Sequence, residues 1–161
     1  MLECKTSHMT YTSSIPDFFG KLKNLDYLSL ALNSLSGPIP SSIGTLRGLT
    51  YLCLDRNKLT GPIPNTLANL PPDSSIYLSH NNLSSLIPKS FGNMKAEILD
   101  FSRNRLTGDA SFLFGGPSKP QIDLSRNLLE FDLSKVAFAR GMRSMDISHN
   151  KIYGGIPSGI V

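Results

Sequence analysis

Acidic and histidine side chains recur along this 161-residue chain at spacings that could support hydrolysis or metal binding. Asp100 and Asp123 are 23 residues apart, and two carboxylates held about 5–5.5 Å from each other can act as the pair of a retaining glycosidase. His80 and His149 offer imidazole nitrogens of the kind that bind zinc. Whether either chemistry is available depends on the elements that position these side chains.

A sixfold repeat supplies those elements. An asparagine recurs every 23 or 24 residues, at Asn33, Asn57, Asn81, Asn104, Asn127 and Asn150. Apolar residues lie five and three positions before each asparagine and two positions after it, as Leu52, Leu54 and Leu59 do around Asn57. The pattern is L-x-L-x-x-N-x-L, which is typical of a leucine-rich repeat with a period of about 20–29 residues.

The repeat predicts an α/β solenoid. Its coils should stack as a right-handed superhelix, with a parallel β-sheet on the concave side and irregular or 3-10 structure on the convex side. The strand segments alternate with period two, so the leucines point inward and the variable residues outward. The asparagine amides should bond backbone groups at the corner after each strand and form a ladder. The Gly and Pro residues that follow suit an outer edge with little regular strand pairing.

We expect one leucine-rich repeat domain over residues 1–161, with six clear repeats at about 20–157 and a degenerate one at about 4–19. Ile15 and Pro16 fit the end of the degenerate repeat, and Leu22 and Leu25 should fill the return half of the first clear coil. Neither end carries an evident cap, and residues 1–10 lack the apolar core of a secretory signal. The sequence therefore predicts a fragment or truncated form, with its terminal caps missing.

The expected solenoid argues against both glycoside hydrolysis and zinc binding. Any column of like residues in a parallel sheet has a separation of about 5 Å, so the spacing of Asp100 and Asp123 is not specific to a glycosidase. Nothing indicates a closed pocket that would separate the pKa values of these two carboxyl groups. His80 and His149 should lie three coils apart, about 14 Å by strand spacing, which is too far for one ion. We expect no enzyme activity, no cofactor and no metal.

Composition narrows the partner classes. The 16 basic and 12 acidic residues are spread along the chain without a run of one charge, which argues against a nucleic-acid-binding arm. No stretch of 18 apolar residues exists, so no transmembrane segment is expected. Cys53 should point outward and Cys4 inward, about 10 Å apart by strand spacing, so a disulfide between them is not expected.

The outward positions of the concave sheet form columns. Four positions before the asparagines lie Ser29, Cys53, Tyr77, Asp100, Asp123 and Asp146. Directly before the asparagines lie Leu32, Arg56, His80, Arg103, Arg126 and His149. An acidic column beside a basic one, with tyrosines toward the N-terminal half, suits recognition of a protein partner. We assign partner binding to Tyr51, Asp55, Arg56, Tyr77, His80, Asp100, Arg103, Asp123 and Arg126.

Four stretches resemble the polygalacturonase-inhibiting proteins of plants. They are IYLSHNNL (76–83), RNRLTGDASFLFG (103–115), QIDLSRNLLEFDLSKV (121–136) and DISHNKIYGGIP (146–157), and the resemblance extends over about residues 12–157. It implies a protein secreted to the plant cell wall that takes part in defence by binding a fungal, pectin-degrading polygalacturonase on its concave face and inhibiting it. Asp132 stands where many relatives begin a glycosylation sequon, and one sequon remains at Asn82.

Two alternative functions stay open. Some plant relatives of this family are antifreeze proteins, and a flat face with regularly spaced hydroxyl groups can order water. The second outer column after the asparagines contains Ser36, Thr60, Ser84, Thr107, Glu130 and Tyr153, and the first one is interrupted by long charged side chains. The other alternative is a receptor-like ectodomain fragment that binds peptides. Besides a secreted polygalacturonase or another protein, the ligands considered are therefore pectin and ice.

Overall fold

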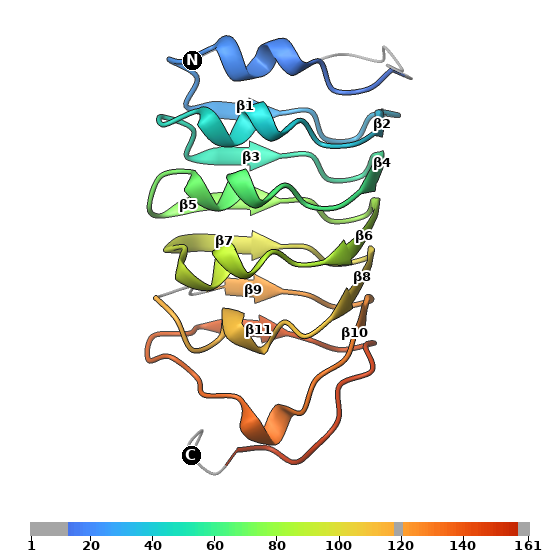
Figure 1. The fold of residues 1–161 in the computed structure, drawn as a ribbon, viewed down its shortest axis with the longest axis vertical. Helices are drawn as coiled ribbons and strands as arrows, with labels where there is room; N and C mark the ends of the chain where they lie inside the picture. The colour runs from blue at the N-terminus through green and yellow to red at the C-terminus, as the bar shows by residue number, and fades with distance from the viewer. Residues whose placement is uncertain (1–12, 118–120, 158–161) are drawn as a thin grey trace.

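The computed structural model describes residues 13–117 and 121–157, which form a stack of similar coils (Figure 1). Each coil begins with a strand of one sheet, turns a corner into a short strand of a second sheet, and returns through a 3-10 helix in most coils. Both sheets are parallel, as expected when successive coils repeat the same path. This architecture is a leucine-rich repeat solenoid with a parallel concave sheet.

The concave sheet contains six strands in chain order. They are β1 (Tyr27–Ser29), β3 (Tyr51–Cys53), β5 (Ser74–Tyr77), β7 (Ala96–Asp100), β9 (Gln121–Asp123) and β11 (Ser144–Asp146). The apolar residue five positions before each asparagine points inward, and at this position Leu52 and Leu99 are fully buried. Met145 occupies the same position in β11 but is 36% exposed, because no coil among the described residues lies beyond it.

A second sheet follows the corner of each coil. It contains β2 (Ser36–Gly37), β4 (Lys58–Gly61), β6 (Asn82–Leu86), β8 (Arg105–Gly108) and β10 (Leu128–Leu129). Our expectation of little regular pairing at this edge was wrong, because the backbones of successive coils are extended there and pair in parallel. Three of these strands end at a glycine with a left-handed backbone, with φ of 76° at Gly37, 78° at Gly61 and 76° at Gly108.

The convex side consists of 3-10 helices, η1 (Asp17–Lys21), η2 (Ser41–Thr45), η3 (Asn65–Asn69), η4 (Lys89–Asn93), η5 (Ser111–Leu113) and η6 (Leu133–Lys135). Each of the first four begins directly after a proline, whose fixed φ suits the start of a helix. The helices stack closely: a Cβ atom at Gly44 would overlap the backbone carbonyl of Thr66 in the next coil. A glycine is therefore required there by space.

One continuous apolar core fills the space enclosed by the concave sheet, the second sheet and the 3-10 helices. It includes buried aromatic residues, among them Phe91 and Phe101, whose rings meet edge to face at 5.4 Å between centroids. We predicted that Leu22 would fill this core, but its side chain is 43% exposed and does not belong to it. Leu25 does pack against it. Among the described residues, no helix has the length and apolar character needed to cross a bilayer.

Candidate interaction surface on the concave sheet

The strand pairing of the concave sheet aligns equivalent positions of successive coils. The column four positions before the asparagines runs in direct register through Ser29, Cys53, Tyr77, Asp100, Asp123 and Asp146. An irregularity between Ser74 and Ser75 in β5 does not disturb this column. One side chain per coil is therefore presented at the spacing of the strands, about 4.8 Å.

Tyrosine rings cover the N-terminal part of the face. Tyr27 and Tyr51 lie directly opposite each other, and their rings stack with centroids 4.5 Å apart and planes 4° apart. Tyr77 belongs to the neighbouring column and meets Tyr51 at 5.4 Å between centroids. Burial raises the pKa of both Tyr51 and Tyr77 above the usual value for tyrosine. The three rings form a rigid, partly exposed aromatic platform.

Cys53 lies in the outward column as expected but is only 8% exposed, which the sequence did not indicate. Its Sγ atom donates to Oδ1 of Asp55 at 2.7 Å. Burial, together with the bond to the Asp55 carboxylate, raises the pKa of the thiol to about 11. Cys53 is a free cysteine, and Cys4 lies outside the described residues, so the expected absence of a bridge between them stays a prediction.

The acidic column is fixed by local backbone bonds. Oδ1 of Asp100 accepts from the backbone N–H of Ser102 at 3.1 Å, and Asp123 and Asp146 accept from the residue two positions on, each at 2.9 Å. The bond from the N–H group of Ser148 lowers the pKa of Asp146. The repeated D-x-S pattern is the sequence signal for these turns, which were not predicted.

The basic column does not continue the extended strands. All six of its residues have left-handed backbone angles, with φ between 52° at Arg103 and 58° at Leu32. Such angles are uncommon for residues other than glycine, and here they recur at the same corner of every coil. The backbone nevertheless stays paired, since the N–H of Arg103 donates to the carbonyl of Ser125 at 2.8 Å. The side chains form a ridge along the edge of the face.

Charge is only weakly neutralised between the two columns and the residues beside them. Arg56 lies 3.7 Å from Asp55, and the described residues show no other ion pair linking the ridge to the acidic side chains of the face. His80 is located between the two arginines of the neighbouring coils. Partial burial and the charges of Arg56 and Arg103 lower the pKa of its imidazole.

The asparagine ladder lies beneath this ridge. Nδ2 of Asn104 donates to the carbonyls of Phe101 and Ser102 in its own coil, both at 3.1 Å, and to Leu78 of the preceding coil at 3.0 Å. Its Oδ1 accepts from the backbone N–H of Leu83 at 2.9 Å. The same set of bonds recurs at Asn57, Asn81, Asn127 and Asn150. Asn33 bonds only its own coil within the described part of the chain.

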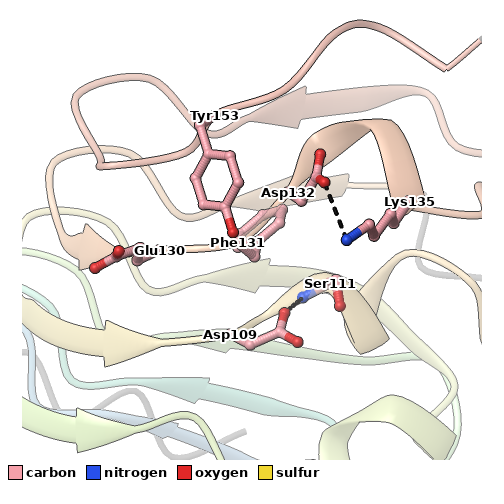
Figure 2. A pocket seen from close by; sticks show the side chains of 7 residues that line it. All are labelled: Asp109, Ser111, Glu130, Phe131, Asp132, Lys135 and Tyr153. Atoms are coloured by element: carbon pink, nitrogen blue, oxygen red, sulfur yellow. Dashed lines mark hydrogen bonds and ion pairs between the residues drawn. The ribbon is translucent and has the colours of Figure 1, made fainter.

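A pocket of about 330 Å³ lies away from the concave face, near the C-terminal end of the second sheet (Figure 2). It is lined by Asp109, Ser111, Glu130, Phe131, Asp132, Lys135 and Tyr153. Asp132 caps η6 by accepting from the N–H of Ser134 at 3.0 Å and forms an ion pair with Lys135 at 3.4 Å. The carboxylate of Asp132 therefore has a structural partner. The described residues hold no cluster of three or more His, Cys, Asp or Glu residues suited to a metal ion.

Sequence comparison identifies the repeats. Residues 24–46, 48–70 and 74–94 match the family model described as Leucine Rich Repeat. A polygalacturonase inhibitor from Pyrus communis is 52% identical over 60 residues, which make up 37% of this chain and 18% of that protein. The aligned stretch is thus less than a fifth of the relative's length.

Solved structures extend the likeness over nearly the whole chain. A plant ice-binding protein superposes with a TM-score of 0.86 and 43% identity, covering 92% of this chain and 48% of that chain. The BIR2 ectodomain from Arabidopsis thaliana has a TM-score of 0.63 and 30% identity, covering 81% of this chain and 71% of that chain. With its repeats, its fold and these similarities, the chain belongs to the leucine-rich repeat family and resembles the polygalacturonase inhibitors within it.

Proposed function

We propose that this protein is a non-catalytic binding protein that recognises a secreted polygalacturonase through the outer face of its concave sheet. The observation that carries the proposal is the ridge formed by the exposed Arg56, Arg103 and Arg126 and the half-buried His80, which lies beside tyrosines that are already rigid. Aromatic and arginine side chains are enriched among the residues that dominate binding energy at protein interfaces. The similarity to polygalacturonase inhibitors supports a polygalacturonase as the partner.

The mechanism is steric and electrostatic. The stacked tyrosines lose little conformational freedom on binding, and the carboxylates of Asp100 and Asp123 are held by neighbouring backbone N–H groups. A partner with a complementary arrangement of charge would be oriented by the ridge and would then cover the platform. Inhibition would result from blocking access of pectin to the enzyme, outside the cell and at the plant cell wall, without any covalent step.

A polygalacturonase assay with the purified chain tests this function. Arg103→Glu and Asp100→Arg should each raise the inhibition constant at least tenfold, which corresponds to about 1.4 kcal/mol. Arg105→Glu is the matched control: it makes the same charge change two residues further along, in β8 of the second sheet, and should leave inhibition within twofold. Absence of inhibition by the parent chain would refute the function, and equal inhibition by all variants would refute the face.

Ice binding is a second candidate because of the 43% identity to a plant ice-binding protein. The second sheet would be the surface for it, but its strands pair with an offset. Ser36 lies opposite Lys58, Thr60 opposite Asn82, and Ser84 opposite Arg105, so hydroxyl groups alternate with longer side chains. Microscopy of recrystallising ice tests this function directly, and crystal growth that is unchanged by the pure protein would eliminate it.

A further inference from the structure

We propose that Asn82 is an N-glycosylation site whose glycan stands on the second sheet and leaves the concave face open. Asn82, Leu83 and Ser84 form the single N-x-S/T sequon of the chain. In the transfer, Nδ2 of Asn82 loses a proton and forms a bond to C1 of a lipid-diphosphate-linked oligosaccharide. The bond from C1 to the diphosphate oxygen breaks, the lipid diphosphate leaves with its electron pair, and the proton from Nδ2 passes to the diphosphate or to solvent.

The two adjacent asparagines of this coil differ in how the fold uses them. Nδ2 of Asn81 donates to the carbonyls of Leu54, Leu78 and Ser79, so a sugar on that nitrogen would break the ladder. The side chain of Asn82 makes no hydrogen bond among the described residues and is partly exposed. A glycan on Asn82 is therefore compatible with the folded coil.

The strand geometry presents the rest of the sequon correctly. Asn82 and Ser84 are two residues apart in β6 and so lie on the same outer face, whereas Leu83 between them is fully buried. The strand neighbour of Asn82 is Thr60, and that of Ser84 is Arg105. A small hydroxyl side chain and a flexible exposed one leave room for the first sugar.

The position of the glycan distinguishes the two faces of the solenoid. It would stand among the hydroxyl residues of the second sheet, next to Thr60 and Ser84, and would obstruct a flat ligand such as an ice surface there. The ridge residue His80 lies on the other side of the corner formed by Asn81. Recognition of a protein by the concave face should therefore tolerate the modification.

The test is expression of the full chain behind a cleavable secretory leader in yeast, followed by mass mapping of the secreted protein. We expect a glycan on the peptide containing Asn82, its removal by a peptide N-glycosidase with conversion to Asp, and its loss in Asn82→Gln and Ser84→Ala. Ser84→Thr, the matched control, should retain it. A secreted chain with unmodified Asn82 overturns the proposal.

A second readout separates this inference from the proposed function. Inhibition of polygalacturonase should agree within twofold between the glycosylated chain and the same chain after enzymatic deglycosylation. A tenfold gain on deglycosylation would overturn the placement of the glycan away from the recognition face. If neither form inhibits, the proposed function fails, while the mass mapping still decides whether Asn82 is modified.

Discussion

The concave sheet and the second sheet use the same repeat but stack it differently. In the concave sheet, strand partners are equivalent positions of successive coils, so Asp100 pairs with Asp123. In the second sheet the partners are offset by two residues, so Ser36 pairs with Lys58 rather than with its equivalent Thr60. Equivalent positions of the repeat therefore lie side by side in the concave sheet but not in the second sheet.

The two sheets also differ in the residue that takes a left-handed backbone conformation in each coil. On the concave side that residue is always larger than glycine, as Arg103 and Arg126 are, and its side chain is presented at the edge of the face. In the second sheet the left-handed residue lies within the strand itself, and it is glycine in β2, β4 and β8 and Ser85 in β6. The concave corner therefore carries side chains for recognition, whereas the second corner mainly permits the turn.

The largest expected effect is a difference in stability between alanine substitutions of Asn81 and Asn82, two adjacent residues at one corner. Asn81→Ala leaves three carbonyls and the N–H of Leu59 without their amide partner, so we expect a loss of about 3 kcal/mol in the free energy of unfolding. Asn82→Ala removes no hydrogen bond within the described structure and should change stability by less than about 0.5 kcal/mol. Urea denaturation of both variants measures the difference, and similar losses would contradict the ladder.

A smaller effect of opposite sign is expected at the end of β6. Ser85 has φ of 73°, a conformation that glycine adopts without strain, so Ser85→Gly should stabilise the protein by up to about 1 kcal/mol. Ser84→Gly, one residue earlier in the extended part of the strand, should instead destabilise it by about 0.5–1 kcal/mol. Thermal unfolding of the two variants checks the sign, and destabilisation by both would show that the glycine positions of the second sheet are not defined by backbone angle.

The smallest effect is a dependence on pH that arises on the concave side alone. The pKa of His80 is lowered from 6.5 in the folded chain, so between that lowered pKa and 6.5 the unfolded chain binds more protons. Stability should therefore rise with pH through this window and level off above it. His80→Asn, which tolerates the left-handed backbone, should remove this component. Denaturation at several pH values compares the two chains, and identical slopes would contradict the lowered pKa that partial burial and the charges of Arg56 and Arg103 give His80.

The sequence predicts the concave sheet well because its signals are local and periodic. The apolar pattern around Asn57 and its equivalents specifies inward residues such as Leu52, and the observed register follows from the repeat period. The second sheet could not be derived in this way, because its pairing depends on an offset that no single coil reveals. The burial of Cys53 was also missed, since it results from Asp55 and neighbouring tyrosines rather than from its own position in the pattern.

The amide ladder also has a direction. Asn57 bonds the carbonyl of Leu30 at 2.9 Å and the N–H of Leu35 at 3.0 Å, and both groups belong to the coil made earlier. As the chain leaves the ribosome from its N-terminus, each new turn thus delivers the side chain that finishes its predecessor. The most recently made coil still lacks these hydrogen bonds. During synthesis each coil is therefore completed only when the asparagine of the next coil has been made.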